Sequence, residues 1–571
     1  MIAGERPEGI AGRGTKRRSG TTHNLSGVRR LRWGVLILPL LVLAPPTKRA
    51  ASDPYPLPSP RPIVPEARYL SVSTDHPFLR DRPLLATVSP NGDGYRDFVD
   101  FRFFLTAPAR IKVKAQTTLR TFQKVAQPAW SVQRRAARGW QTIRWRPSPD
   151  LDPTTYAVLL TVSSGRQSLR YGRVTRGSTD APGPIVRVLG ISAAFDKSSY
   201  APGEVAQLTV SSDAVGLTVR VVDVAGSEVQ PTVNGLDGPD VVAPSHYPWE
   251  ANRDNSVTLP LQIGDWRPGV YFAALSTEAG DVGYAPLIVR APAPHSRVAV
   301  LIPDQTWSAY NFNDDDRDGF PDTWYAGGSN ILTLGRPFEH AGVPWQFGSQ
   351  MWPFLRWARL HAVDVDFLAE ADAVKRGAAL PADYDLIVVP THLEYVTEAE
   401  YEALQHYRDE GGDLIFLASN DLYWKVDIDG SSMHKVARWR ELGRPESALV
   451  GAQYAGSKTG DVAPYVVADS TAVGWAFAGT GLTPAALFSF AGTEFDVTTA
   501  ASPPGTQVLA TVRTATHRGE MTYYELGAAK VFAPGTFFSA RVLQAPESRL
   551  LENVWNRSDA PDLPPPQPAA R

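Results

Sequence analysis

The spacing of apolar residues changes along the chain. Between residues 68 and 292, apolar and polar positions alternate in short bursts, as in "DFVDFRFFLTAPARIKVKAQ" and "TYAVLLTVSS", with Gly and Pro between them. A period of two is typical of strands that bury one face. We therefore predict two Ig-like β-sandwich modules, at residues 68–180 and 186–292.

From residue 296 onward, continuous apolar runs replace the alternation. "RVAVLIP", "DLIVVP" and "DLIFLAS" are buried-strand patterns, separated by segments with helical spacing. One such helix is expected to begin at Thr397, where Glu400 completes a capping box, and to end at the Gly411-Gly412 pair. This alternation predicts an α/β doubly wound domain with a mainly parallel sheet at residues 296–556.

Polar side chains follow three of these predicted strands directly. Tyr310 follows the first run, His392 and Glu394 follow the second, and Asn420 follows the third. Ligands bind at the carboxyl ends of parallel strands, so these four residues are expected at one edge of the sheet. Phenolate and carboxylate oxygens suit a hard cation, which indicates metal-assisted hydrolysis. The alternative is that the rings are packed aromatics and Glu394 only begins a helix.

An acidic loop interrupts the segment after Tyr310. In "NFNDDDRDGFPDTWY", the carboxylates of Asp314, Asp316, Asp318 and Asp322 surround a Gly turn. Alternating carboxylates before a Gly are typical of oxygen cages for calcium. The loop lacks the closing glutamate of an EF-hand, and the alternative is a solvated acidic turn.

Both ends of the chain differ from the middle. Residues 1–45 combine a basic lead with the apolar run "WGVLILPLLVLA", the layout of an export signal or a loose membrane anchor. A Pro-rich linker is predicted at residues 46–67 and a disordered tail at residues 557–571. These features predict a secreted or cell-envelope protein that meets the membrane only through its N-terminal segment. The alternative for the lead is a disordered basic tail.

Composition narrows the classes of function. The 571 residues carry a net charge of −2, so no global charge indicates a nucleic-acid partner. The chain has no Cys, which excludes disulfides, thiolate metal sites and a lipoprotein anchor. Stability is therefore expected from the size of the cores.

Several motifs of residues 296–556 together resemble a known family. "VLIPDQTWSAYN", "MWPFLRW", "VDVDFL", "VVPTHLEYVTEAEYEALQHYRDEGGDLIFLASND" and "KVFAPGTFF" are similar to the C-terminal domain of the large (beta) subunit of N,N-dimethylformamidase. The resemblance implies a class-I-amidotransferase-like fold. It also implies a ferric ion held by two tyrosines and one glutamate, and hydrolysis of N-substituted formamides to an amine and formate. Separately, "SPNGDGYRD" resembles the opening of FlgD-like immunoglobulin-type modules.

The resemblance assigns roles to individual residues. It implies that Tyr310 and Glu394 bind iron and that His392 and Asn420 line the pocket. The second tyrosine ligand has no clear match, and Tyr325 is the candidate for it. A further catalytic glutamate is implied, with Glu520 as the candidate and Glu525 as the alternative.

Two functions remain open on the sequence. The first is an exported, metal-dependent hydrolase of C–N amide bonds that uses iron and carries a calcium site, with a small amide as its partner. The second is a non-catalytic cell-envelope or glycan-binding protein that keeps the fold and binds an envelope ligand.

Overall fold

The computed structural model describes residues 64–118, 126–325 and 330–564. The predicted signal or anchor at residues 1–45 and all but the last few residues of the predicted linker lie outside these ranges. Within the described ranges, no helix has both the length and the apolar character needed to cross a bilayer.

The first module contains two sheets around one core. Its sheets have the strand orders β1-β3-β6 and β2-β9-β7-β4-β5, with β8 paired to β7. Side chains that alternate along β3 and β4 point inward, with Phe101, Phe103, Ile111 and Val113 fully buried between the sheets. The strands are β1 (Ala67–Ser73), β2 (Leu85–Val88), β3 (Val99–Leu105), β4 (Ala109–Gln116), β5 (Pro128–Ala136), β6 (Gly139–Trp145), β7 (Thr155–Ser164), β8 (Gln167–Tyr171) and β9 (Ile185–Val188).

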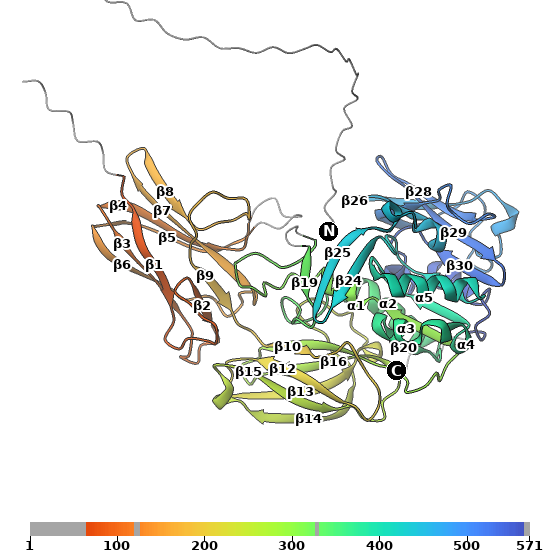
Figure 1. The fold of residues 1–571 in the computed structure, drawn as a ribbon, viewed down its shortest axis with the longest axis horizontal. Coiled ribbons are helices and arrows are strands. Elements are labelled where there is room, and N and C mark those ends of the chain that lie inside the picture. Colours follow the sequence, from red (N-terminus) through yellow and green to blue (C-terminus); the bar gives the residue numbers. More distant parts are fainter. Residues whose placement is uncertain (1–63, 119–125, 326–329, 565–571) are drawn as a thin grey trace, which may run out of the picture. The chain divides into compact units, whose positions relative to one another are not determined.

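The second module repeats the two-sheet arrangement around its own core. The sheets have the orders β10-β12-β15 and β11-β17-β16-β13-β14. Figure 1 shows both β modules and the mixed domain that follows them. The strands are β10 (Ser192–Phe195), β11 (Ser199–Tyr200), β12 (Val205–Ser211), β13 (Gly216–Asp223), β14 (Asp240–Pro248), β15 (Ser256–Gln262), β16 (Gly269–Ser276) and β17 (Val282–Val289).

A nine-stranded sheet forms the centre of the remaining chain, in the order β20-β18-β21-β23-β30-β29-β28-β26-β27. The strands from β20 to β30 pair in parallel, and the others pair antiparallel. A smaller sheet, β19-β25-β24-β22, lies beyond it. The strands are β18 (Val298–Ile302), β19 (Ile331–Thr333), β20 (Asp366–Ala369), β21 (Leu386–Val389), β22 (Tyr395–Thr397), β23 (Asp413–Phe416), β24 (Trp424–Asp429), β25 (Ser432–Arg438), β26 (Gln453–Val467), β27 (Leu487–Val497), β28 (Gln507–Arg513), β29 (Arg518–Leu526) and β30 (Ala529–Ala533).

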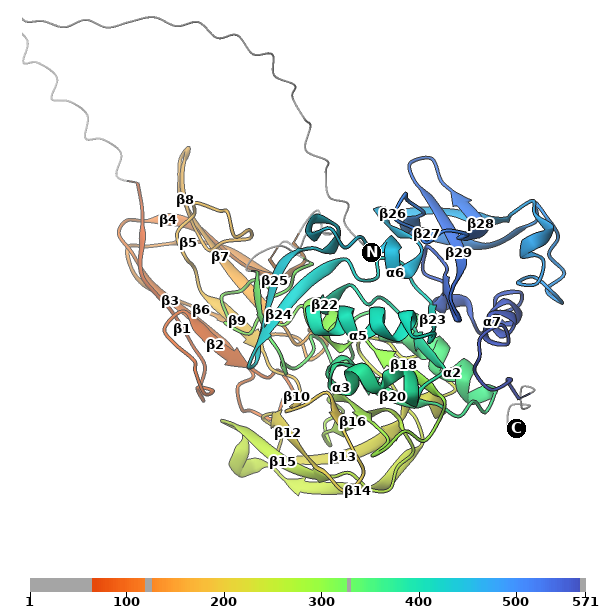
Figure 2. The ribbon, with the colours of Figure 1, turned by 45° about the vertical axis from the view of Figure 1, so that its right-hand side comes forward.

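Helices cover both faces of the parallel strands. Ala299 and Leu301 of β18 pack in the same core as α3, α4 and α5, whereas Val298 and Val300 pack with α2 and α7. This two-sided burial explains the continuous apolar runs, and Figure 2 shows α5 and α3 in front of the sheet. The helices are α1 (Asp304–Ala309), α2 (Trp352–Leu360), α3 (Glu370–Arg376), α4 (Leu380–Asp383), α5 (Glu398–Asp409), α6 (Ser447–Val450) and α7 (Glu547–Trp555).

The coarse prediction of a multidomain, β-rich chain is confirmed. The class-I-amidotransferase-like fold and the FlgD-like module stay predictions. Order extends past the predicted start of the tail at 557, because the Asp559 backbone N–H donates to Asp413 at 2.6 Å and Ala560 is buried. Residues 565–571 of that tail lie outside the described ranges.

Candidate active site

Tyr310 and Glu394 meet at the carboxyl ends of β18 and β21. The turn formed by α1 carries Tyr310 to this edge, and the Tyr310 hydroxyl donates a hydrogen bond to the Glu394 carboxylate. Both side chains are buried, at 6% and 5% exposure. Burial raises the pKa of Glu394 to about 7, while hydrogen bonds from Tyr310, Asn420 and Tyr395 act in the opposite direction. The phenol and the carboxylate, distant in sequence, are therefore direct neighbours.

His392 is held as a neutral ring with one free nitrogen. Its Nδ1 lies 2.7 Å from the Ser419 carbonyl oxygen, so Nδ1 carries the proton and donates. Nε2 is buried and has no hydrogen-bond partner among the described residues. Burial lowers the pKa of His392 to about 4, so the ring is uncharged at neutral pH. A lone pair on Nε2 is thus available to accept a proton or a hydrogen bond.

Asn420 follows β23 in a left-handed conformation, with φ of 61°. Asn adopts this region more readily than most residues, so the backbone can turn the side chain toward the site. The Asn420 backbone N–H donates to both carboxylate oxygens of Asp496, at 3.1 and 3.0 Å. Asn420 Oδ1 is buried without a partner among the described residues. The turn is therefore fixed through the backbone, which leaves the amide oxygen for a ligand.

Glu494 on β27 joins this cluster, although the sequence analysis did not select it. It is 2% exposed, and its Oε2 lies 3.6 Å from His392 Nδ1. Burial, followed by the charge of Glu394, raises the pKa of Glu494 well above its usual range. This shift favours the protonated, uncharged form of the Glu494 carboxyl.

Tyr395 is a second phenol at Glu394. The Tyr395 side chain is buried and hydrogen-bonds the Glu394 carboxylate, and burial followed by that charge raises its pKa. The predicted second tyrosine, Tyr325, also lies close, with its ring centroid 5.1 Å from that of Tyr310. The structure therefore offers two phenols beside Tyr310, one of which directly follows Glu394 in "HLEY".

Glu520 is not brought into the hydrogen bonds of this cluster. Its carboxylate accepts hydrogen bonds from the backbone and hydroxyl of Thr498, both at 2.7 Å, and pairs with Arg518. Glu525 accepts from Tyr523 and Arg557. Neither position offers a carboxylate beside Tyr310, whereas Glu494 does.

The acidic loop gathers three of its four predicted carboxylates. Oxygens of Asp314, Asp316 and Asp322 all lie within 4.8 Å of one another. Asp318 lies outside this group and accepts from the backbone N–H of Phe320, and Arg176 pairs with both Asp318 and Asp322, at 3.4 and 3.5 Å. Burial raises the pKa of Asp314 to about 7, and the Asp318 charge adds to this rise.

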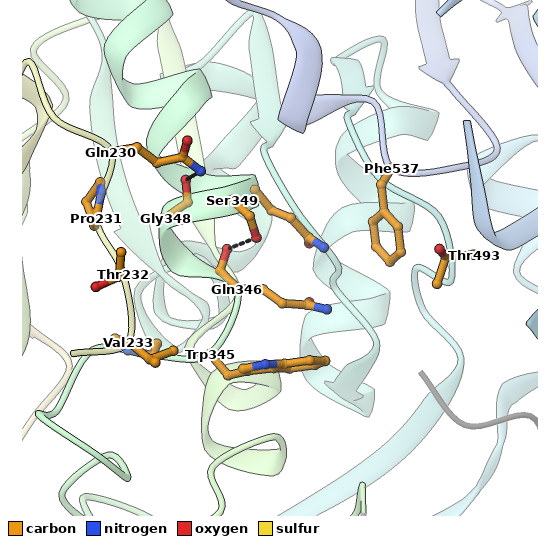
Figure 3. Close-up of a pocket in the computed structure, with 12 residues that line it drawn as sticks. Gln230, Pro231, Thr232, Val233, Trp345, Gln346, Gly348, Ser349, Thr493 and Phe537 are labelled. Atoms are coloured by element: carbon orange, nitrogen blue, oxygen red, sulfur yellow. Dashed lines mark hydrogen bonds between the residues drawn. The ribbon is translucent and has the colours of Figure 1, made fainter. Parts of the chain in front are cut away.

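Figure 3 shows the lining of a cavity, which has a volume of about 390 Å³. Phe537 lines it and packs edge-on against the His392 ring at 4.5 Å, and Gln350 accepts a hydrogen bond from Thr391. Gly348 is required at its wall because a Cβ there would lie 1.9 Å from the Pro231 carbonyl oxygen. The other lining residues are Gln230, Thr232, Val233, Pro344, Trp345, Gln346, Ser349 and Thr493.

A family description covers most of this region. The family described as N,N-dimethylformamidase beta subunit-like, C-terminal matches residues 225–549, which is more than half of the chain. The chain belongs to this family. All twelve residues that line the cavity in Figure 3 fall within the matched range.

Two curated relatives carry the same description. The chain is 29% identical over 115 residues to the N,N-dimethylformamidase beta subunit of Paracoccus aminophilus, which covers 20% of this chain and 15% of that protein. It is 28% identical over 102 residues to the N,N-dimethylformamidase beta subunit of an Alcaligenes species, which covers 18% of this chain and 13% of that protein. The matches thus span less than a sixth of the length of these relatives.

Two solved structures that match this chain are distant likenesses. A putative thua-like protein from Bacteroides uniformis has a TM-score of 0.27 at 14% identity, over 46% of this chain and 91% of that one. The Yersinia pseudotuberculosis adhesin InvE has a TM-score of 0.14 at 16% identity, over 39% of this chain and 58% of that one. Scores this low support no argument about the fold.

Proposed function

We propose that this chain hydrolyses N-substituted amides at the buried cluster around Glu394. Family membership already indicates a hydrolase-like function. The observation that carries the finer proposal is the meeting of a phenol, a carboxylate and a neutral imidazole at one edge of the sheet. These residues come from two separate strand ends, those of β18 and β21, and packing alone does not require such polar groups to converge in a buried place.

The residues present fit a ferric ion. Tyr310 and Glu394 supply oxygen donors in contact with each other, and Tyr395 adds a second phenol. Buried atoms without partners among the described residues surround them, namely His392 Nε2 and Asn420 Oδ1. An iron ion held there supplies Lewis acidity toward an amide carbonyl oxygen. A cation also reverses the effect of burial, because it favours the charged forms of the phenols and the carboxylate.

The remaining groups divide the proton transfers between them. His392, uncharged with a free Nε2, accepts a proton from the water that adds to the carbonyl carbon. Glu494, whose protonated form is favoured by burial, donates a proton to the amine nitrogen as the C–N bond breaks. The Asn420 side chain positions the substrate amide. The products are a carboxylate and an amine.

Formate release from N,N-dimethylformamide tests this proposal on the purified, iron-loaded full chain. Glu394→Gln is expected to lower kcat/KM by at least about 100-fold, since it removes a charged group from the reacting centre. Glu525→Gln, an exposed glutamate in the same domain, is the matched control and should leave the rate unchanged. Equal rates for Glu394→Gln and the unmodified chain would remove the proposal.

Two further parts of the proposal concern the surroundings of this site. We propose that Asp314, Asp316 and Asp322 bind calcium, because oxygens of their carboxylates all lie within 4.8 Å of one another. We also place the protein in the envelope or outside the cell, on the basic lead and apolar run of residues 1–45. Fractionation of cells that produce the full chain tests the second statement.

A further inference from the structure

A second cavity, of about 530 Å³, reaches Tyr310 from the side of the first β module. The family match begins at residue 225, so the first β module lies outside it. This module nevertheless supplies eight of the 17 residues that line the cavity, namely Thr117, Gln127, Pro128, Ala129, Leu151, Asp152, Thr154 and Tyr156. One wall of the cavity thus comes from residues outside the matched range.

Hydrogen bonds hold this wall against the matched domain. Thr154 Oγ1 donates to Glu339 at 3.1 Å, and the neighbouring Thr155 Oγ1 donates to Asp314 at 2.6 Å. Thr118 Oγ1 donates to the Gly319 carbonyl oxygen at 2.8 Å. Glu339 is itself buried, at 9% exposure, and lines the cavity. The wall is therefore fixed at several points around the same opening.

The cavity ends beside the proposed active site. Tyr310 lines it, and the Tyr310 hydroxyl donates to Glu394. Trp345 also lines it, with its ring centroid 5.8 Å from that of Tyr310, and contributes to the cavity of Figure 3 as well. A molecule in this second cavity would thus lie next to a residue of the reacting centre.

The lining defines the chemistry of the occupant. The ring and aliphatic side chains of Phe312, Phe338, Val343 and Trp345 make one side apolar. Glu339 and Asp152 are the acidic residues of the lining, His340 lies 3.5 Å from the Glu339 carboxylate, and none of the 17 lining residues is Lys or Arg. An anionic ligand would lie beside these acidic side chains in a lining that has no Lys or Arg, which is unfavourable.

The size of the cavity exceeds what the smallest amides need. At about 30 Å³ for each non-hydrogen atom, the share of one water in the liquid, the cavity holds roughly 15 to 20 such atoms. N,N-dimethylformamide would fill only a minor part of this space.

We infer that the second cavity binds the substituent of a larger, uncharged amide with a bulky apolar group, and that the first β module selects this substrate class. The inference rests on the proposed amide hydrolysis and states which class of amide that activity would prefer. The apolar group packs between the wall supplied by the first β module and the rings of Phe312 and Phe338, while the amide group lies toward Tyr310. Carboxylate-bearing amides are discriminated against by Glu339 and Asp152.

A matched pair of ligands tests the inference on the full, iron-loaded chain. N-phenethylformamide and N-formylphenylalanine share one skeleton, and the second adds a carboxylate. We expect calorimetry to show the first binding at least about tenfold more tightly, a difference of about 1.4 kcal/mol. Formate release is followed in parallel.

Variants of the wall locate the binding. Ala129→Trp places a large ring in the cavity and is expected to weaken binding of N-phenethylformamide by about tenfold, with release of formate from N,N-dimethylformamide unchanged. Ala137→Trp, the same substitution at an exposed position just after β5, is the control and should change neither. Glu339→Gln should reduce the difference in affinity between N-phenethylformamide and N-formylphenylalanine.

The outcomes separate the two proposals. Tight binding of N-phenethylformamide without formate release would support the cavity and overturn the hydrolase. Hydrolysis of N,N-dimethylformamide together with equal affinities for the ligand pair, or with no effect of Ala129→Trp, would overturn the cavity assignment alone. If Ala129→Trp does not fold, the ligand pair and Glu339→Gln decide the question.

Discussion

Two buried carboxyl groups, Glu370 and Glu400, lie in the first turns of α3 and α5. Their raised pKa values predict that the stability of this region depends on pH. Glu370 begins α3, Glu400 lies in the first turn of α5, and both are fully buried. Gln305 links them, because its backbone N–H donates to Glu370 and its Nε2 donates to Glu400 at 3.3 Å. Burial, followed by the charge of Asp304, raises the pKa of Glu400 to about 8. Burial, followed by the charge of Glu400, raises the pKa of Glu370.

The sign of the effect follows from proton binding. Glu400 has a usual pKa of 4.5, so between that value and about 8 the folded state binds a proton that the unfolded chain has lost. The contribution of Glu400 to the free energy of unfolding is fully present below pH 4.5, and it is lost as the pH rises toward 8. At about 1.4 kcal/mol for each pH unit, the loss between pH 5 and pH 8 has an upper value of about 4 kcal/mol.

Glu400→Gln removes this titration while it keeps the shape of the side chain. The free energy of opening α5, measured by hydrogen exchange with mass spectrometry from pH 5 to pH 8, should therefore fall less steeply in the variant. Hydrogen exchange follows the opening of α5 itself and does not require a multidomain chain to unfold in one step. Glu410→Gln, exposed at the end of the same helix, is the control and should follow the unmodified chain. If the free energy of opening α5 falls with pH equally steeply in Glu400→Gln and in the unmodified chain, the reasoning is refuted.

Three further predictions concern other parts of the same domain. Glu494→Gln should lower formate release by about 100-fold or more, as expected for the loss of a proton donor, whereas Glu520→Gln should retain the rate. The reverse result would show that Glu520 is the proton donor. Calcium should raise the melting temperature of the chain and of Asp315→Asn but not of Asp316→Asn, and a rise that persists in Asp316→Asn would contradict the calcium site. Thr397→Ala removes the acceptor at the start of α5 and should destabilise this helix by about 1 kcal/mol in the exchange measurement, so unchanged protection would contradict the cap.

The parallel strands were predictable because burial on two faces leaves a continuous apolar run. In β18, Val298 and Val300 face one core and Ala299 and Leu301 face the other, which alternation of apolar and polar residues could not satisfy. The start of α5 was equally visible, since the Thr397 side chain accepts from the Glu400 backbone N–H at 3.3 Å. Local signals of this kind depend on a few neighbouring residues.

The cluster was predictable only where it lies at strand ends. Tyr310, His392, Glu394 and Asn420 follow parallel strands, so topology brings them together. Glu494 lies inside β27, at the far edge of the same sheet, and its carboxylate lies close to His392. This contact depends on the tertiary path of the chain, which no local sequence pattern reveals. Tyr395 was overlooked because neighbouring residues of an extended strand face opposite sides, whereas Glu394 precedes β22 in an irregular segment.

The central claim is that Tyr310 and Glu394 hold one transition-metal ion together. Elemental analysis of the purified full chain and of Glu394→Ala, combined with the visible absorption spectrum, tests it most directly. We expect one equivalent of iron and a phenolate-to-iron absorption band in the unmodified chain, with both lost in Glu394→Ala. Iron-free, colourless preparations of both proteins would contradict it, as would equal iron content in the two.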